Sequence, residues 1–361
     1  MVEGKLKIKI AGSKVRITSS RPLNLSRIFK GKDPIEILTM VPLLYNICGK
    51  AHSIAAVRAF ESAMGFTEGG ACLKLRNYLL NLENLREHLW RIFLDWPKLL
   101  GAKAKIGEFS KINQELTKLM QNLPEDLLRP FCQIKARPPD IWHELQIYLK
   151  IKVFGAVDFA DISTVSDLEQ WSADSMTEPA DFIRYIFSKR LASLGQQSTE
   201  YMSDISPKKM AARLAKPDVS GFVKEPLWQG KCLDTGPLAR WHKSPLLQDI
   251  QDQYANGILA RNSARLLEVW KILNAEVDNL PSKTEAGLAQ VETSRGRLYH
   301  KVSLARDLVS NYAILAPTEW NFHPRGVAAK ALKGINNQEY ARLVIMSIDP
   351  CVDYGLEIAH A

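Results

Sequence analysis

The sequence predicts a mainly helical α+β fold, in which a helical bundle carries small antiparallel sheets near the two termini. Long segments with helical apolar spacing occupy the middle of the chain, and short alternating segments lie near its ends. No internal repeat and no low-complexity linker divides the 361 residues. A chain of this length can bury one large core. We therefore expect a single domain spanning residues 1–361.

The N-terminal elements carry clear local signals. Residues 6–10 and 14–18 alternate around Ala11-Gly12-Ser13, which predicts a β-hairpin. Asp33 and Pro34 predict a helix start, with Asp as N-cap and Pro at the first helical position. Pro42 should interrupt that helix, because proline lacks the backbone donor.

The remaining elements follow from apolar periodicity and breakers. Two further strands are expected at 298–302 and 312–315, and the stretch 200–245 is irregular. Helices are expected at 52–64, 73–96, 105–122, 140–151, 179–194, 257–278 and 336–348.

Composition narrows the class of protein. The chain is 46% hydrophobic and 24% charged, which is typical of soluble globular proteins. No apolar run approaches the ~18 residues that span a bilayer, so no membrane insertion is expected. The N-terminus lacks the apolar region of a signal peptide, which predicts a cytoplasmic protein. The net charge of +9 is scattered among acids without a nucleic-acid motif, so we expect no nucleic-acid partner.

The cysteines are few. Five is an odd number, which argues against disulfides and fits a reducing compartment. Cys48 and His52 would share one face of a helix. With Cys351 they would form a metal or redox site if the fold joins the chain ends. Spacing alone favours the plainer interpretation of a buried thiol and a bonded histidine. Cys72, Cys132 and Cys232 have no ligand spacing and are interpreted as buried or incidental.

Six segments, in order, resemble the large subunit of [NiFe] hydrogenases. The first resembles the family opening Glu-Gly-His-Leu-Arg-Ile, the third its Val-Gly-Pro-Leu-Ala-Arg signature, and the last its closing Asp-Pro-Cys. The six segments are Glu3 to Ile8, Ile28 to Pro34, Lys224 to Arg240, Glu292 to Gly296 with His300, Pro317 to Asn321 with Pro324 and Arg325, and Asp349 to Cys351. The resemblance implies the large-subunit fold.

The two cysteine motifs of that family are incomplete here. In Arg-x-Cys-Gly-x-Cys-x-x-x-His, Tyr45 stands at the first cysteine and Cys48 at the second. In Asp-Pro-Cys-x-x-Cys-x-x-His, Cys351 keeps the first cysteine while Tyr354 replaces the second. The resemblance makes Cys48 and Cys351 the candidate metal ligands, and Tyr45 and Tyr354 lost ligand positions. A four-thiolate nickel site cannot form with two thiolates missing, so no nickel is expected.

The resemblance also assigns surrounding roles. Arg295 and Thr318 match groups near the diatomic ligands of the iron, and His52 matches a group beside the bridging sulfur. Glu3 matches a carboxylate that passes protons. Ser294 and Gly326 replace a family proline and aspartate.

Incomplete motifs of this kind are similar to those of the HupK/HoxV type of hydrogenase maturation protein. That resemblance implies a non-catalytic scaffold that transiently holds or helps assemble an iron unit with cyanide and carbonyl ligands, Fe(CN)2(CO). Its expected partners are hydrogenase accessory proteins, including the small chaperone of the iron unit, and the hydrogenase large subunit. One alternative is a metal-free mimic of the large subunit that only binds proteins. An active nickel-dependent hydrogenase is disfavoured by Tyr45 and Tyr354.

Overall fold

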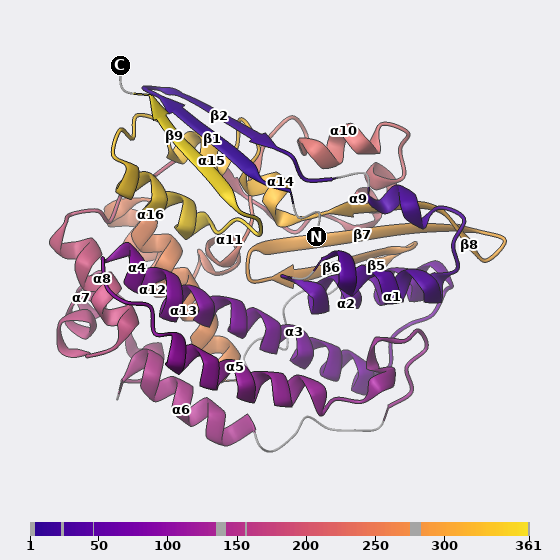
Figure 1. The fold of residues 1–361 in the computed structure, drawn as a ribbon, viewed down its shortest axis with the longest axis horizontal. Coiled ribbons are helices and arrows are strands. Elements are labelled where there is room, and N and C mark those ends of the chain that lie inside the picture. Colours follow the sequence, from indigo (N-terminus) through magenta and orange to yellow (C-terminus); the bar gives the residue numbers. More distant parts are fainter. Residues whose placement is uncertain are drawn as a thin grey trace.

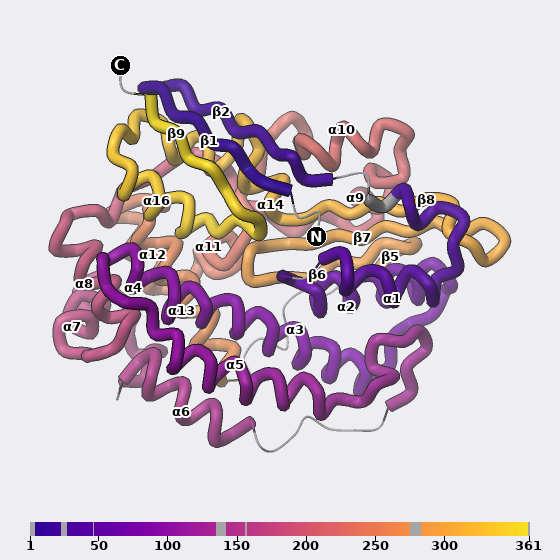
Figure 2. The backbone as a smooth tube through the Cα atoms, in the orientation of Figure 1, coloured from indigo at the N-terminus to yellow at the C-terminus, as the bar shows by residue number. Residues whose placement is uncertain are grey.

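The two ends of the chain meet in one small sheet. The computed structural model describes residues 4–22, 25–45, 47–134, 142–155, 157–274 and 283–359, with the side chains of 25 and 26 left aside. Strand β1 (Leu6–Ala11) pairs antiparallel with β2 (Lys14–Ser19) and parallel with β9 (Tyr354–Ala359). Figure 2 shows these first and last strands side by side. Leu6, Ile8 and Ile10 point into the core, as alternation requires.

A bundle of helices forms the larger part of the molecule (Figure 1). Helix α13 (Ile258–Leu273) is buried on almost every side and packs against α3, α11, α12 and α16. The other helices of the bundle are α3 (Gly70–Trp90), a π-helical segment (Arg91–Asp95), α4 (Trp96–Leu99), α5 (Ile106–Gln121), α6 (Trp142–Phe154), α7 (Val165–Asp174), α8 (Glu178–Ser188) and α16 (Gln338–Ile348), with 3-10 turns at Glu125–Leu128 and Phe159–Asp161.

A second sheet lies against helix α2 (Gly49–Ala63), which packs on β6 and β7. This sheet has the order β5 (Lys283–Glu285), β6 (Leu288–Thr293), β7 (Gly296–Ala305) and β8 (Leu308–Leu315). All three pairings in it are antiparallel. Helix α1 (Pro34–Leu44), preceded by a 3-10 turn (Leu25–Phe29), packs beside α2.

The stretch between residues 200 and 245 holds short elements. Two-residue strands β3 (Glu200–Tyr201) and β4 (Leu233–Asp234) pair in parallel. The helices here and after are α9 (Pro207–Leu214), α10 (Val219–Lys224), α11 (Pro237–Trp241), α12 (Pro245–Tyr254), α14 (Pro317–Asn321) and α15 (Val327–Ala331).

The predicted α+β class is confirmed, with two local differences. The terminal sheet is mixed, because β9 joins β1 in parallel. Helix α1 continues through Pro42, whose position near the helix end limits the number of bonds lost. Asp33 caps that helix as predicted, since its side chain accepts from the Ile35 N–H at 2.7 Å. Among the described residues, no helix is long and apolar enough to cross a membrane.

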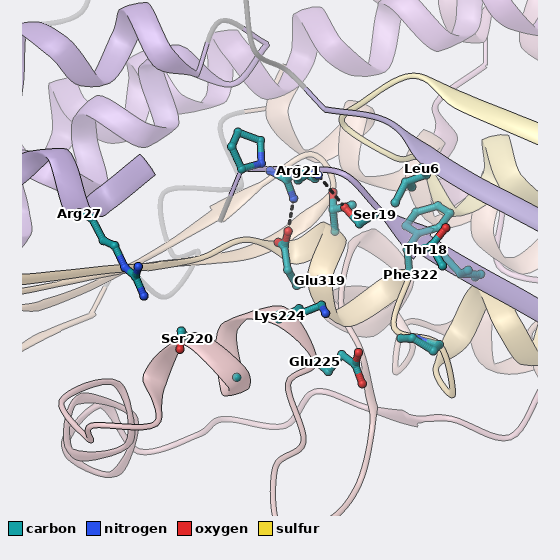
Figure 3. Close-up of a pocket in the computed structure, with 15 residues that line it drawn as sticks. Leu6, Thr18, Ser19, Arg21, Arg27, Ser220, Lys224, Glu225, Glu319 and Phe322 are labelled. Atoms are coloured by element: carbon teal, nitrogen blue, oxygen red, sulfur yellow. Dashed lines mark hydrogen bonds and ion pairs between the residues drawn. The ribbon is translucent and has the colours of Figure 1, made fainter. Parts of the chain in front are cut away.

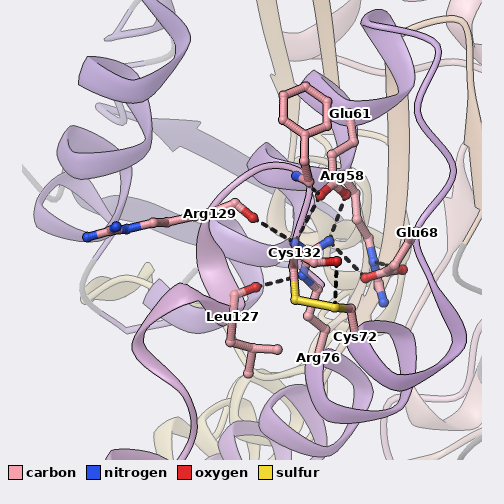
Figure 4. Close-up of a disulfide and its surroundings, with 9 residues drawn as sticks. Arg58, Glu61, Glu68, Cys72, Arg76, Leu127, Arg129 and Cys132 are labelled. Carbon is pink, nitrogen blue, oxygen red and sulfur yellow. Dashed lines mark hydrogen bonds and ion pairs between the residues drawn. A yellow bond between two sulfur atoms is a disulfide. The ribbon is translucent and has the colours of Figure 1, made fainter. Parts of the chain in front are cut away.

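The prediction of unpaired Cys72 and Cys132 is wrong: they form a disulfide across 60 residues, although both are buried as expected. It sits beside a closed ion-pair network at the C-terminal part of α2 (Figure 4). Arg76 donates to Glu61 at 2.7 and 3.0 Å and to Glu68 at 2.9 Å. Its remaining bonds go to the carbonyls of Leu127 and Arg129. Sequence spacing could not show this pair, because tertiary packing alone brings α3 to the loop after Leu128.

Candidate functional site

The first thiol of the site lies at the start of α2. Cys48 occupies the N-cap position, and its side chain is partly exposed. Glu83 of α3 accepts hydrogen bonds from the N–H groups of Lys50 and Ala51, both at 2.8 Å. These are helix N-terminal donors that would otherwise lack partners. Glu83 therefore fixes the turn that carries Cys48 against the bundle.

The second thiol follows the last helix. Asp349 ends α16 in the left-handed region with φ of 67°, which turns the chain toward Cys351. Cys351 is partly exposed and free. The hydroxyl oxygen of Thr318 lies 2.9 Å from its sulfur. Thr318 itself is buried in α14, so it presents its hydroxyl to this thiol from a fixed position.

Arg295 lies between the segment that carries Cys48 and the segment that carries Cys351. It lies in the turn between β6 and β7 and is almost fully buried. Its Nη1 lies 3.3 Å from Cys48 Sγ, its Nη2 is 3.1 Å from Glu87, and its Nε is 3.2 Å from Asp349. Burial lowers the pKa of Arg295, but Asp349, Cys48, Glu87 and Cys351 together hold it well above the usual value. The guanidinium is thus a permanent cation between both thiols.

Asp349 balances this charge. Its carboxylate forms ion pairs with Arg295, with Arg265 at 3.1 Å and with Arg91 at 2.7 Å. Burial raises the pKa of Asp349, and the three guanidinium groups outweigh that effect and hold the pKa well below its usual range. The carboxylate is therefore ionised and anchors the residues just before Cys351.

The turn that holds Arg295 is itself tightly supported. Asn321 donates to the carbonyls of Arg295 and Thr235 at 3.1 and 2.8 Å. Gly296 has φ of 131°, and a Cβ there would lie 2.6 Å from Thr235 Cγ2. Only glycine fits this close approach. The segment before Arg240 thus supports the site, and Arg240 bridges Glu268 and Glu292.

His52 lies one turn into α2, beneath Tyr45. The two rings stack with centroids 4.0 Å apart and planes 7° apart. His52 Nδ1 is 3.0 Å from His300 Nε2, and His300 Nδ1 is 2.8 Å from the Tyr312 hydroxyl. Burial holds the pKa of His52 well below its usual value and lowers that of His300 to about 3. Both imidazoles are therefore neutral at physiological pH.

The two tyrosines at the lost positions have different surroundings. Tyr45 lies over His52, and desolvation raises its pKa to about 12 although Arg21 opposes the shift. Tyr354 lies in β9 opposite Leu6 and packs on the main core. Within the described ranges, no hydrogen bond or ring contact joins Tyr354 to Cys48, Cys351 or Arg295. Tyr45 thus lies beside His52 and near Arg21, whereas Tyr354 belongs to the terminal sheet.

Several residues of the site have no signal of their own in the sequence. Arg21, just after β2, forms an ion pair with Glu319 of α14. Burial lowers the pKa of Arg21, but the charges of Cys351, Glu319 and Tyr45 raise it overall. Glu83 and Glu87 lie on α3, and neither is part of a recognisable motif. Contacts across the fold bring these residues to the thiols, and local spacing could not reveal them.

The other predicted positions stand as follows. Glu3 lies outside the described residues. Cys232, interpreted as incidental, is partly buried, and its sulfur lies 3.3 Å from His323 Nδ1. His52 makes no side-chain hydrogen bond with Cys48 among the described residues, but its N–H donates to the Cys48 carbonyl at 3.0 Å.

The donor set limits what the site can hold. In the part of the chain that the structure describes, no group of three or more His, Cys, Asp or Glu side chains is arranged for a metal ion. Two free thiols, a guanidinium and a hydroxyl therefore form the available set. Two thiolates suit a soft metal that brings its other ligands with it, and the cation suits negatively charged ligands on that metal.

Known proteins resemble this chain over nearly its whole length. A hydrogenase expression/formation protein HupK of Bradyrhizobium diazoefficiens is 28% identical, covering 95% of this chain and 91% of that protein. HoxV of Cupriavidus necator, which is also named a hydrogenase expression/formation protein, is 26% identical, covering 96% of this chain and 93% of that protein. The chain is a relative of the HupK and HoxV proteins.

The hydrogenase likeness also appears at the level of motif and fold. A family described as nickel-dependent hydrogenase matches residues 239–352. The Ni-Fe-Se hydrogenase of D. vulgaris Hildenborough in the reduced state superposes with a TM-score of 0.64 at 18% identity, covering 94% of this chain and 93% of that chain. The fold of this HupK and HoxV relative is therefore that of a hydrogenase large subunit.

Proposed function

We propose that the chain is a non-catalytic scaffold in [NiFe] hydrogenase maturation. It would hold the Fe(CN)2(CO) unit as cargo between Cys48 and Cys351 and then release it to a true large subunit. The names of its relatives, hydrogenase expression/formation proteins, support a role in maturation. We further propose that it acts in the cytoplasm, with the small chaperone of the iron unit as donor.

One observation carries the proposal: Cys48 and Cys351 each have a different polar partner that suits an iron unit. Arg295 Nη1 faces Cys48 Sγ at 3.3 Å, and Thr318 Oγ1 faces Cys351 Sγ at 2.9 Å. Both partners are buried and fixed by the fold. With the unit bound, the guanidinium and hydroxyl would donate to cyanide nitrogens, and charge-assisted bonds of this kind are strong.

The thiols would bind the cargo as thiolates. Desolvation raises the pKa of Cys48, and Glu83 and Glu87 add to the rise while Arg295 opposes it. Without metal the thiol is therefore protonated at neutral pH. Binding a metal ion removes that proton, because thiolate is the ligand form. We propose that the site takes iron and no nickel, since Tyr45 replaces a thiolate and stacks on His52 instead.

Infrared spectroscopy of protein purified anaerobically after coproduction with the maturation machinery tests the proposal. The expected result is a set of CO and CN stretching bands in the wild type that disappears in the Cys48→Ala/Cys351→Ala double variant. Cys232→Ala is the matched control and should keep the bands. Absence of bands in the wild type under these conditions would overturn the cargo role.

The metal-free alternative gives a different outcome in the same preparations. A protein-binding mimic would copurify with hydrogenase subunits or accessory proteins equally well in the wild type and the double variant. The scaffold proposal instead expects hydrogenase activity of the host to fall in the double variant. Unchanged maturation together with unchanged copurification would favour the mimic.

A further inference from the structure

A surface cleft lies beside the Cys351 half of the site. It runs between the end of β2, helix α10 and helix α14, and encloses about 540 Å³. Figure 3 shows Arg21 and Glu319 at one side, with Ser220 and Lys224 of α10 and Glu225 just after it facing them. The structure therefore leaves open space on the outer side of α14.

Thr318 connects this cleft with the thiol. It lines the cleft, and its hydroxyl oxygen lies 2.9 Å from Cys351 Sγ. Arg21 also faces both regions. It lines the cleft, and the negative charges that raise its pKa include that of Cys351 as well as Glu319 and Tyr45. Thr318 thus lies between the inner end of the cleft and Cys351, the second thiol of the site.

Glu319 supplies a polar group without a partner in this cleft. Its side chain is more than nine-tenths buried. One carboxylate oxygen pairs with Arg21, while Oε2 has no hydrogen-bond partner. Burial raises the pKa of Glu319 although Arg21 opposes the shift, and Oε2 is covered from solvent, so the Arg21–Glu319 pair closes the inner side of the cleft.

The rim of the cleft carries further cations. Arg27 and Lys224 line it and have exposed side chains without an ion pair among the described residues. Cyanide nitrogens accept hydrogen bonds, and these groups donate them. Glu225 also lies on the rim, but the two cations outnumber it, so the rim suits a metal unit that carries such ligands.

We propose that this cleft is the entrance through which the iron–cyanide unit reaches Cys351, with the Arg21–Glu319 pair as its inner boundary. The proposal rests on the scaffold function for its cargo. In the protein without metal, reagents should likewise reach Cys351 through the cleft.

Thiol alkylation of the reduced, metal-free full chain tests the access claim. Gly221 of α10 lines the cleft, and a side chain added there would meet nothing within 4 Å. Gly221→Trp should slow iodoacetamide labelling of Cys351 about five-fold or more, because thiol reactivity follows access. Ser220→Trp, one residue away and also exposed, should give the same result. Labelling is followed by mass spectrometry of the Cys351 peptide.

The controls are built into the chain. Gly107 in α5 is an exposed helical glycine with equally open surroundings, and Gly107→Trp should leave Cys351 labelling unchanged. Cys232 labelling in the same samples reports whether each variant keeps its fold. Unchanged Cys351 labelling in both cleft variants would overturn the entrance proposal.

Charge at the rim gives a second measurement. Lys224→Glu should slow labelling of Cys351 by anionic iodoacetate about two-fold more than labelling by neutral iodoacetamide, a difference that salt should reduce. Equal slowing of both reagents would count against the cationic rim. These labelling measurements do not depend on iron. If the wild type shows no CO and CN bands, the scaffold function is contradicted while the result on access to Cys351 still holds. Conversely, CO and CN bands that appear at the same rate in Gly221→Trp as in the wild type would contradict the entrance proposal alone.

Discussion

Helix α2 connects two sites that use cysteines in opposite ways. At the closed end, which comprises Glu61, Glu68, Cys72, Arg76 and Cys132, the sulfurs are joined in a disulfide. Arg76 is fully buried there, and its donors go to two carboxylates and two backbone carbonyls. The closed end therefore leaves no donor of this arginine for a ligand.

The open end comprises Cys48, Glu83, Arg295, Asp349 and Cys351. Its two sulfurs are free, and one donor of the buried Arg295 faces the Cys48 thiol instead of an acid. Ion pairs to Glu87 and Asp349 fix the rest of this guanidinium. A sulfur is a weak acceptor, so this donor is available for a better one. The comparison indicates that the closed end holds the fold and the open end is prepared for a ligand.

The largest expected difference comes from the two arginines. Arg76→Met leaves Glu61 buried without its cation, and breaking a buried pair in this way costs about 3–5 kcal/mol. We expect urea unfolding to show a decrease of that size in the free energy of unfolding. Figure 4 shows Arg58 as a second cation of this network, with its Nε 3.0 Å from Glu68.

Arg295→Met is the matched variant at the open end. Asp349 keeps Arg91 and Arg265, and Glu87 keeps Arg86 at 3.3 Å, so no acid is left without a cation. We expect a smaller loss of unfolding free energy than in Arg76→Met, together with loss of the CO and CN bands. Equal destabilisation by the two variants would show that the ends do not differ in this respect.

Removing the disulfide should have the next largest effect. Cys72→Ala/Cys132→Ala opens a loop of 60 residues. Because the unfolded chain gains conformational entropy, we expect the free energy of unfolding to fall by about 2–4 kcal/mol. Thermal denaturation would measure this decrease. Iron retention should remain as in the wild type, in contrast to Cys48→Ala/Cys351→Ala. Loss of the infrared bands without loss of stability would assign the disulfide to the site and not to the fold.

Local sequence predicted those parts of the molecule that depend on neighbours in the chain. The hairpin of residues 6–19 and the cap at Asp33 follow from alternation and from side-chain chemistry within a few residues. The chosen site residues Arg295 and Thr318 could be found only through resemblance to hydrogenase motifs. The structure puts them beside Cys48 and Cys351, while their role toward iron stays a prediction.

Tertiary contacts determine the parts that the sequence did not predict. Arg21 pairs with Glu319 across 298 positions, and Cys72 joins Cys132 across 60. Neither pair has a periodicity or a spacing rule that marks it. Strand β9 was missed because a short edge strand after Asp349-Pro350-Cys351 has no turn signal linking it to β1. Such pairings become visible only when the chain ends meet.

Glu83 gives the smallest effect, and it tests how the turn that carries Cys48 is held against α3. Burial raises its pKa to about 7, although the N–H groups of Lys50 and Ala51 and the charge of Arg86 oppose the shift. The folded protein therefore binds this proton more tightly than the unfolded chain, so the stabilisation is complete below about pH 4.5 and is lost as pH rises to about 7. Between pH 5 and pH 8 the unfolding free energy of the wild type should fall by about 2 kcal/mol relative to Glu83→Gln, which does not titrate. Urea unfolding at both pH values measures the difference, and Glu357→Gln on the exposed edge of β9 is the matched control. A parallel pH dependence of the wild type and Glu83→Gln would mean that α2 is not anchored through this carboxyl group.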